Sequence, residues 1–304
     1  MSIIHYQFPL MPASLDCILC LSRQSLEAAR LATDDETKHA AVLKQALQLV
    51  QKKGFTTIPP LVAQDIQRII RRETGSDDPY IVQKQQANEL MLSVRDSLRQ
   101  RIRQSEQPLE TAVQLAIAGN SVDCALRSDW NEELILNTVK TAMKQPLNGN
   151  INEFIQFVSN AKKMLYLLDN CGEIVCDQLL IEEIQRTFPA LQITAVVRGM
   201  PVLNDATKKE AEQIGLPLTV PVIDNGNDAV GTILEQCGAE FQEHLRNADS
   251  ILSKGLANYE TLVEYDSAKV PQAVCYLFKA KCPFIARFAG VGLGDAVLRL
   301  SGRA

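Results

Sequence analysis

The stretch MLYLLDNCGEIVCDQLLIEEI, residues 164–184, joins an apolar run to a helical pattern through a polar turn. The run 164–168 is continuously apolar, which is typical of a strand buried on both faces of a sheet. It stops at Asp169-Asn170, and Gly172 follows before apolar residues return at helical spacing. A carboxylate and an amide side by side at a glycine turn either cap the turn or hold a ligand.

Short apolar runs of the same kind recur beyond about residue 151. They are KMLYLLD, LQITAVVRG, LPLTVPVID, ADSILSKG, VCYLFKA and CPFIARFAG. Helical stretches such as VCDQLLIEEIQRTF and DAVGTILEQCGAEFQEHLRNA separate the first four. Strands that alternate with helices indicate a parallel sheet covered on both faces. We therefore expect residues 151–304 to form a Rossmann-like catalytic domain of the α/β class, doubly wound, mostly parallel and three-layered (α/β/α).

Residues 1–150 have a different spacing of apolar residues. HAAVLKQALQLVQKK and QANELMLSVRDSLRQRI repeat apolar residues at spacings of three and four, which predicts helices. Pro59-Pro60 and the GSDDPY turn at 75–80 separate these helices. The sequence predicts a helical N-terminal domain that precedes the α/β domain.

Composition narrows the class of partner. The 304-residue chain is 46% hydrophobic and 22% charged, with a net charge of −5 and a pI near 5.4. This balance argues against a nucleic-acid partner, which usually needs a basic face. No apolar stretch approaches the roughly 18 residues that span a bilayer. We expect a cytoplasmic protein that binds no membrane and no nucleic acid; the sequence leaves its oligomeric state open.

Eight cysteines are spread along the chain, and Cys17 and Cys20 form its one CxxC pair. A zinc site needs about four ligands, and no second CxxC or HxxxH in the sequence supplies the other two. The pair also opens a helical run, whereas a thioredoxin-like pair follows a strand. We expect buried, reduced thiols, with metal or redox chemistry as the alternative.

The predicted sheet indicates where a site would lie, because ligands of open parallel sheets bind outside the carboxyl ends of the strands. Polar residues gather at these ends. They are Asp169-Asn170, Arg198-Gly199 leading to Asn204-Asp205, Asp224-Asn225 and Lys254-Gly255, with Lys279 inside the fifth strand.

Several of these residues also have a purely structural interpretation. The segment 224–228, DNGND, is typical turn chemistry, with Asn227 or Asp228 as a candidate cap of the next helix. Asp205 differs, because Thr207 and Glu210 already form a capping box and leave its carboxylate available.

Oxygen-bearing side chains at Asp169, Asn170 and Asp205 would suit Mg²⁺ or Mn²⁺. The chain has only three histidines, none near these turns, so an imidazole cage is not expected. Lys254 precedes a glycine turn whose backbone N–H groups could bind an anion, and Asn258 is a candidate helix cap. A metal facing cations across a cleft is typical of phosphoryl chemistry.

The motifs LLDNCGE, VVRGMPVLNDAT, SKGLANYETL, LFKAKCP and GVGLGDAVL together resemble the metal-dependent damage-control phosphatases, long catalogued as a domain of unknown function. The resemblance extends to DCILC, DDPY, KQQAN and AIAGNSVD in the helical half. The CxxC resembles the prokaryotic branch of that family.

This resemblance implies specific roles. Asp169, Asn170 and Asp205 would bind a divalent metal (Mn²⁺, Co²⁺, Ni²⁺ or Mg²⁺), and Asp169 and Asn170 would serve catalysis. A separate set would contact a small phosphorylated metabolite: Lys254, which would also be catalytic, Lys279, Arg198, Asn258 and Asn120. The family turn is often KGQGN or KGDLN, whereas this chain has KGLANY. The family's activity is hydrolysis of phosphate monoesters such as sugar phosphates.

Other classes of protein would need other residues at these positions. A covalent aspartyl-phosphatase usually carries a second Asp where this chain has Cys171, and a methyltransferase would need a glycine-rich loop where only Gly172 is present. A metal- and phosphometabolite-binding sensor without turnover would use the same groups as the enzyme. Glu173 either orients a metal ligand or favours the helix dipole.

Overall fold

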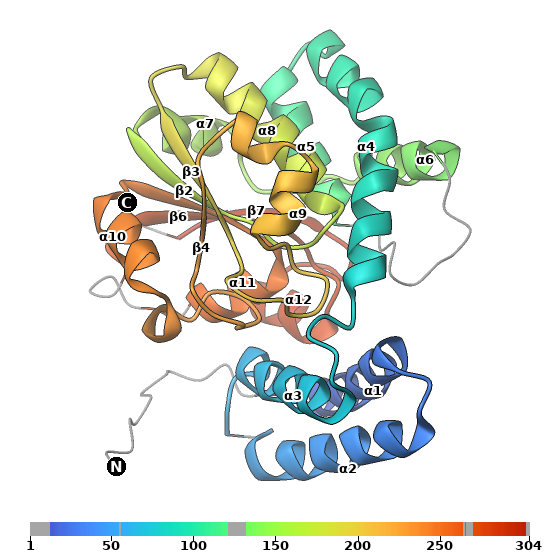
Figure 1. Cartoon of the computed structure of the whole chain (residues 1–304). Coiled ribbons are helices and arrows are strands. Elements are labelled where there is room, and N and C mark those ends of the chain that lie inside the picture. The colour runs from blue at the N-terminus through green and yellow to red at the C-terminus, as the bar shows by residue number, and fades with distance from the viewer. Residues whose placement is uncertain (1–12, 55, 121–131, 264, 266–269, 302–304) are drawn as a thin grey trace.

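The computed structural model describes residues 13–54, 56–120, 132–263, 265 and 270–301. Within these ranges a helical region comes first, and a mixed sheet flanked by helices follows (Figure 1). The strands of the sheet are β1 (Leu147–Asn148), β2 (Lys163–Leu167), β3 (Gln192–Val197), β4 (Val222–Asp224), β5 (Ser250–Lys254), β6 (Ala273–Lys279) and β7 (Ala296–Leu300).

The strand order is β1-β7-β6-β5-β2-β3-β4. Every neighbouring pair is parallel except β6 and β7, which run antiparallel. The chain leaves β2 toward β3 and β4 on one side and then returns to β5 on the other. The carboxyl ends of β2 and β5 therefore mark the point where the strand order reverses, which is where open α/β sheets bind ligands.

Helices precede, link and follow the strands. They are α1 (Leu15–Ala32), α2 (Glu36–Lys53), α3 (Pro59–Thr74), α4 (Ile81–Gln104), α5 (Pro108–Gly119), α6 (Glu132–Ala142), α7 (Ile151–Ser159), α8 (Glu173–Thr187), α9 (Lys208–Gln213), α10 (Ala239–Asn247), α11 (Gly255–Leu262) and α12 (Pro283–Ala289). Two short 3₁₀ turns, η1 (Leu216–Leu218) and η2 (Leu234–Gln236), complete the described elements.

Strand β2 shows why the sheet needs helices on both faces. Met164 and Tyr166 pack into one hydrophobic core with α4, α5 and α8, whereas Leu165 and Leu167 pack into a second core with α10, α11 and α12. Alternate side chains point to opposite faces of a strand, so a continuous apolar run has to be covered twice. The predicted α/β class and three-layer arrangement are confirmed.

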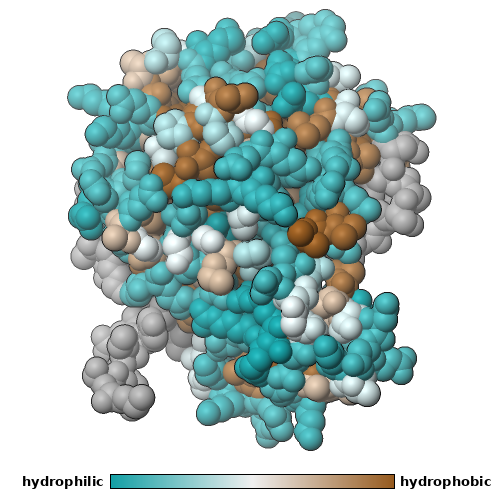
Figure 2. Space-filling view, viewed as in Figure 1, coloured by the Kyte–Doolittle hydropathy of each residue, from teal (hydrophilic) through white to brown (hydrophobic). Residues whose placement is uncertain are grey.

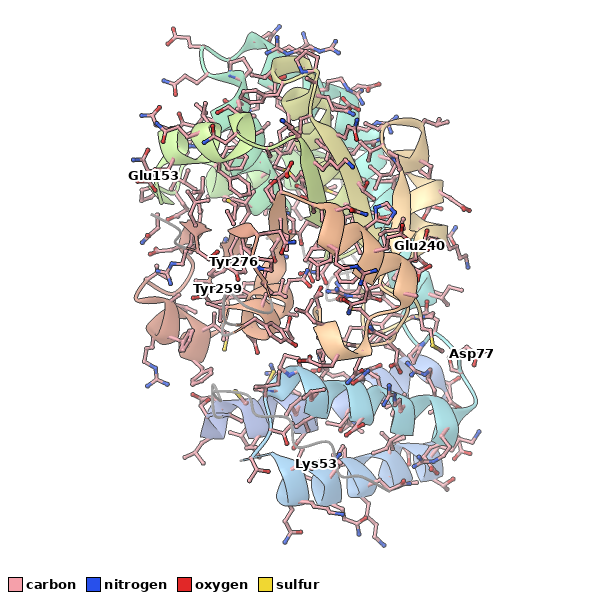
Figure 3. All side chains as sticks on the ribbon, turned by 90° about the vertical axis from the view of Figure 1, so that its left-hand side faces the viewer. Lys53, Asp77, Glu153, Glu240, Tyr259 and Tyr276 are labelled. Atoms are coloured by element: carbon pink, nitrogen blue, oxygen red, sulfur yellow. The ribbon has the colours of Figure 1, made fainter. Side chains whose placement is uncertain are left out.

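Helices α1, α2 and α3 form a bundle that lies below the rest of the molecule in Figures 1 and 3. Their core also takes in Val202 and Val230, from loops at the carboxyl ends of β3 and β4. The later helices α4–α6 instead pack against α8 and share the core of the sheet. The division into domains at residue 150 stays a prediction.

The breaks between the helices of the N-terminal region were predicted correctly. Pro59 is the first residue of α3, where a missing N–H costs nothing. Helix α3 ends at Thr74 and is capped by Gly75, whose φ of 78° a glycine adopts freely, and α4 begins after the GSDDPY turn. Asp77, in that turn, is labelled at the junction of the bundle and the larger part in Figure 3.

Two predictions about elements were wrong, and one strand was missed. The run CPFIARFAG is helix α12, because Pro283 and a Gly290 cap bound a segment whose Ile285, Ala286 and Ala289 are buried on one side. Strand β7, in the quoted motif GVGLGDAVL and just beyond it, was not predicted as a strand. The expected long helix after residue 228 is a loop, η2 and α10 only, so Asn227 and Asp228 cap no helix.

Cys17 and Cys20, the CxxC pair of α1, are both free thiols, and Cys17 is buried. The prediction that both cysteines of the pair are buried was wrong for Cys20, which is exposed.

The surface is largely hydrophilic in the view of Figure 2, with hydrophobic patches mainly on the larger part. None of the helices in the described ranges is both long and apolar enough to cross a membrane.

Candidate active site

Two carboxylates meet where the loops after β2 and β3 cross. The N–H of Ala206 donates to the carbonyl of Asp169 at 2.9 Å, and the N–H of Cys171 donates to that of Asn204 at 2.9 Å. These backbone bonds fix Asn170 opposite Asp205. The predicted metal ligands are therefore brought together by the fold.

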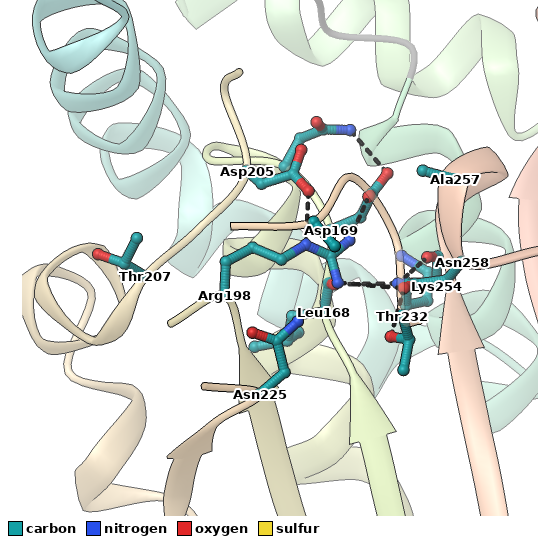
Figure 4. A network of polar contacts seen from close by, with 12 residues as sticks. Leu168, Asp169, Arg198, Asp205, Thr207, Asn225, Thr232, Lys254, Ala257 and Asn258 are labelled. Atoms are coloured by element: carbon teal, nitrogen blue, oxygen red, sulfur yellow. Dashed lines mark hydrogen bonds and ion pairs between the residues drawn. The ribbon is translucent and has the colours of Figure 1, made fainter. Parts of the chain in front are cut away.

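The Arg198 guanidinium lies between the two carboxylates (Figure 4). Its Nε donates to Oδ2 of Asp205 at 2.6 Å, and its Nη2 donates to Oδ1 of Asp169 at 3.5 Å. Its Nη1 donates to Oδ1 of Asn258 at 3.1 Å. Arg198 was predicted as a substrate ligand, and the structure places it among the predicted metal ligands.

Asn258 joins the ends of β2 and β5. Its Nδ2 donates to the carbonyls of Leu168 at 3.2 Å and Lys254 at 2.8 Å, while Oδ1 also accepts from the Thr232 hydroxyl at 2.8 Å. The prediction that Asn258 caps a helix was wrong, because α11 begins three residues earlier, at Gly255. Its carboxamide orients Arg198 instead.

Glu173, the first residue of α8, accepts hydrogen bonds from two side-chain amides. Its Oε2 accepts from Nδ2 of Asn120 and from Nδ2 of Asn170, the latter at 3.3 Å. Asn170 also donates to Oδ2 of Asp169 at 2.9 Å. With its NH₂ group engaged on carboxylates, Asn170 directs its carboxamide oxygen away from Glu173. These contacts fit the predicted orienting role of Glu173, and its place as the first residue of α8 also fits the predicted helix-dipole role.

Lys254 is fully buried at the end of β5. Its ammonium donates to Oε1 of Glu173 at 2.6 Å, to Oδ1 of Asp177 at 2.5 Å and to the carbonyl of Ala116 at 3.0 Å. These contacts account for all three of its hydrogens. Burial alone would lower the pKa of Lys254, but the Asp177 and Glu173 carboxylates raise it above its ordinary value.

The cluster holds more negative than positive groups. Asp169, Asp205, Glu173 and Asp177 supply four carboxylates, and Arg198 and Lys254 supply two cations. Burial raises the pKa of Asp169 well above its usual value, and the Asp205 and Glu173 carboxylates raise it further. Burial also raises the pKa of Asp205, although Arg198 opposes the shift, and raises that of Asp177 to about 7. A divalent cation would balance this excess.

No residue with a side chain fits at the position of Gly255. Its φ is 79°, and a Cβ built there would lie 1.9 Å from Oδ2 of Asp169. The absence of a side chain lets the Asp169 carboxylate approach the first turn of α11, where helix N–H groups favour an anion.

Most of the cluster is buried, and Asn170 is half-buried. Asp169 is 5% exposed, Asp205 2% and Arg198 3%. Val202 and Val230, on the loops after β3 and β4, pack into the core of the α1–α3 bundle, together with the partly buried Leu203 and Ala257. The bundle therefore lies across the carboxyl edge of the sheet.

Lys279 lies at the end of β6, two strands from β2 in the sheet. Burial lowers its pKa, and Lys281 contributes to the shift. The segment 224–228 behaves as the predicted turn: the N–H of Gly226 donates to Asp224, and that of Asn227 donates to Asn225, at 2.9 and 3.2 Å.

Sequence reasoning missed Asp177, Tyr166 and Thr232. Tyr166 donates to Oδ1 of Asp177 at 2.8 Å, and burial raises the pKa of its hydroxyl. Asp177 follows Glu173 by four residues, so both carboxylates lie on one face of α8. That spacing was the available signal. Nothing near Thr232 in the sequence indicated its contact with Asn258.

The donor set fits a hard divalent cation in type and charge. Asp169, Asp205 and Asn170 offer carboxylate and carboxamide oxygens, the ligands that Mg²⁺ and Mn²⁺ prefer. As the side chains lie, no three His, Cys, Asp or Glu residues in the described ranges surround a common point. Arg198 supplies the positive charge between the two carboxylates in this arrangement, and a metal would have to displace it in part.

Residues 13–297 match the model of the damage-control phosphatase ARMT1-like domain. The chain is 34% identical to a damage-control phosphatase of Archaeoglobus fulgidus over 287 residues, which cover 93% of this chain and 97% of the relative. It is 31% identical to a damage-control phosphatase of Pyrococcus horikoshii over 289 residues, covering 94% and 97%.

A crystal structure of a DUF89 family protein from Pyrococcus horikoshii has the same fold, with a TM-score of 0.86 at 30% identity, covering 95% of this chain and 99% of the other. The chain belongs to the damage-control phosphatase ARMT1-like family. The family predicted from the motifs is confirmed, and it covers both the helical region and the sheet.

Proposed function

We propose that the protein is a metal-dependent phosphatase that hydrolyses phosphate monoesters of small metabolites such as sugar phosphates. One observation carries the proposal: in a member of this family, Asp169, Asn170 and Asp205 converge where the strand order reverses, within a cluster that has excess negative charge. The names of the relatives support the reaction class.

Each group has a proposed task. Asp169, Asn170 and Asp205 hold Mn²⁺, Co²⁺, Ni²⁺ or Mg²⁺, which supplies charge neutralisation and acidification of a water when bound. Arg198, released in part from the carboxylates, contacts phosphate oxygens through its planar fork. Glu173 orients Asn170 and Asn120 by accepting from both amides. Lys279, Asn258 and Asn120 complete the proposed substrate set.

Lys254 is proposed as a phosphate ligand because it precedes a glycine turn and because the family resemblance implies that role. Its three hydrogens are engaged by Glu173, Asp177 and Ala116, so a substrate contact requires it to release one of these acceptors. Until substrate binds, its contact with Glu173 supports the orientation of Asn170.

The test is release of inorganic phosphate from a panel of sugar phosphates, with and without Mn²⁺ and EDTA. Asp205→Ala should lose turnover and metal binding but keep its fold, because the N–H of Thr207 still donates to Glu210 at 2.9 Å and the capping box is independent of Asp205. Asp224→Ala is the matched control: it removes a carboxylate at the neighbouring strand end that pairs with Lys208 instead.

The alternative is a sensor that binds metal and phosphometabolite without turnover. It predicts ligand-induced stabilisation of the parent chain and no phosphate release with any member of the panel. Activity that survives EDTA and Asp205→Ala unchanged would contradict the metal-dependent mechanism itself.

A further inference from the structure

The turn DNGN at 224–227, which follows β4, is bonded to the end of β3 on both sides of Arg198. The N–H of Asn225 donates to the carbonyl of Val197 at 2.9 Å, and the N–H of Gly199 donates to Oδ1 of Asn225 at 2.9 Å. Gly199 allows this close approach, because a Cβ built there would lie 2.6 Å from a backbone nitrogen of the turn. Asn225 is thereby held beside Arg198, a cation of the proposed active site.

The carboxamide of Asn225 uses only its oxygen within the protein. Oδ1 accepts from the N–H groups of Gly199 and Asn227, at 2.9 and 3.2 Å. Two backbone donors identify this end as the oxygen, so the opposite end is the NH₂ group. The side chain is fully buried, yet Nδ2 has no acceptor among the described residues. Buried polar atoms are almost always hydrogen-bonded, so this donor requires an acceptor from outside the chain.

Asn227, in the same turn, uses both ends of its carboxamide. Its Oδ1 accepts from the N–H of Ala229 at 2.8 Å, and its Nδ2 donates to the carbonyls of Asn225 at 3.3 Å and Gln236 at 3.1 Å. The turn therefore needs the whole amide of Asn227 for its own structure, whereas it needs only the oxygen of Asn225.

The unused NH₂ group lies on the active-site side of the turn. Figure 4 shows Asn225 next to Arg198, with its amide nitrogen on the side that faces the guanidinium. Both residues follow directly on the carboxyl ends of neighbouring parallel strands, β3 and β4, where open sheets bind ligands. An amide NH₂ and a guanidinium are both donors, so the ligand that they can share is rich in acceptor oxygens, and a phosphate group is such a ligand.

We propose that Asn225 is a substrate-binding residue whose Nδ2 donates to a phosphate oxygen of the bound metabolite, beside Arg198. This inference rests on the proposed phosphatase function and adds the end of β4 to the strand ends that bind substrate. The turn at 224–227 then has two tasks: Asn227 holds its shape, and Asn225 presents a donor in a fixed direction.

Asn225→Asp tests the donor with little change of shape. The carboxylate keeps an oxygen that accepts from Gly199 and Asn227, and it replaces the NH₂ group by an oxygen that repels phosphate. For the sugar phosphates that the parent hydrolyses, we expect KM to rise by at least about tenfold. The value of kcat should change far less, which is the pattern of lost ground-state binding. Inorganic phosphate should weaken as a product inhibitor by a similar factor.

Asn227→Asp is the matched control. It makes the same change of atoms and charge in the same turn, but it places an oxygen against the two backbone carbonyls that Nδ2 of Asn227 now contacts. This variant should have a lower melting temperature than the parent and a KM near the parental value. If Asn225 were only structural, Asn225→Asp would behave in the same way.

A measurement on the parent needs neither a folded variant nor turnover. Nuclear magnetic resonance of the ¹⁵N-labelled full chain follows the side-chain NH₂ signals while inorganic phosphate is added in the presence of Mg²⁺. The signal of Asn225 should shift as phosphate binds, and that of Asn227 should stay in place.

Two results would overturn the inference. One is a folded Asn225→Asp variant that keeps the parental KM, which would assign an internal water as the acceptor of Nδ2. The other is an NH₂ signal of Asn225 that phosphate leaves in place. If the parent itself hydrolyses no sugar phosphate, the proposed function fails instead, and the titration with phosphate still decides the role of Asn225.

Discussion

At the scale of single residues, Gly255 and Gly290 make a matched pair. Both have positive φ, 79° and 67°, but a Cβ on Gly255 meets the Asp169 carboxylate, whereas one on Gly290 meets nothing within 4 Å. Gly290→Ala should cost roughly 1–2 kcal/mol of stability from backbone strain alone and leave activity intact. Gly255→Ala should cost more and abolish metal binding.

The measurement is urea unfolding together with Mn²⁺ affinity for both variants. Equal losses of stability with unchanged metal affinity would show that Asp169 can move aside, and that its approach to α11 is not required.

Lys254→Met tests a buried ion-pair network. Removing the ammonium leaves Glu173 and Asp177 without their cation, and breaking a buried pair from one side typically costs about 3–5 kcal/mol. Adding Asp177→Asn to Lys254→Met should recover part of that loss, because the uncompensated charge is removed. A double-mutant cycle by chemical denaturation measures the coupling.

The kinetics separate the two roles of Lys254. If it also contacts the phosphoryl group, Lys254→Met should lose about 10²–10³ in kcat even under conditions where the variant is fully folded. A folded variant within a few-fold of the parent would assign phosphate binding to Arg198 or Lys279.

Much of the site was predictable from the sequence, because strand ends are easy to recognise and parallel strands bring their carboxyl ends together. Asp169, Asn170, Arg198 and Asp205 were found this way, and the structure joins them. Contacts that depend on side-chain direction were not predictable. Lys254 turns toward α8 and Asn258 sits inside α11, and only three-dimensional packing decides either.

At the scale of elements, α3 is held to the loop after β4 by one carboxylate. Asp228 accepts from Gln64 at 2.8 Å, from Arg68 at 2.6 and 2.9 Å, and from Arg71. Arg71 also donates to the carbonyl of Pro201 at 2.9 Å, on the loop after β3. These contacts of Asp228 and Arg71 hold the α1–α3 bundle over the site.

Asp228→Asn should destabilise the protein at neutral pH. Burial alone would raise the pKa of Asp228, but the donors from α3, led by Arg68 and Gln64, lower it to about 2. A depressed folded-state pKa stabilises the fold above the unfolded pKa, about 4, and that contribution disappears as the pH falls through about 2. The difference between parent and variant should therefore shrink between pH 4 and 2.

Asp65→Asn is the control, because Asp65 pairs with Lys53 on the more exposed surface of the same bundle. Its effect should stay within about 1 kcal/mol. A pH-independent difference for Asp228→Asn would mean that shape, not charge, holds α3 in place.

Elements were predictable wherever their pattern was long. The strands β2 and β6 are apolar except at one end, whereas α12 has only seven residues, all of them apolar but Arg287. A short apolar segment has no resolvable period, so strand and helix cannot be separated by pattern alone. The long helix predicted after Asp228 does not form for another reason. The side chains of Asn225, Asn227 and Asp228 make their hydrogen bonds to the loop and to α3.

At the scale of the whole molecule, the metal should contribute to stability. A ligand at 100 times its dissociation constant stabilises the folded state by about 2.7 kcal/mol, so EDTA should lower the melting temperature of the parent. It should have no effect on Asp205→Ala, which lacks a proposed metal ligand. Calorimetry of the two chains with and without EDTA makes the comparison, and equal shifts in both would place the stabilising metal elsewhere.

The bundle α1–α3 is linked to α4 by the single turn at 75–80, yet it meets the rest of the chain through the Asp228 group and the shared core with Val202 and Val230. A break in the backbone within that turn should therefore leave the molecule assembled. Two separately produced polypeptides, one ending near Gly75 and the other beginning near Asp78, should associate into an active complex. Asp228→Asn should weaken that association. The amount of reassembled complex would therefore measure how strongly Asp228 holds the bundle to the rest of the molecule.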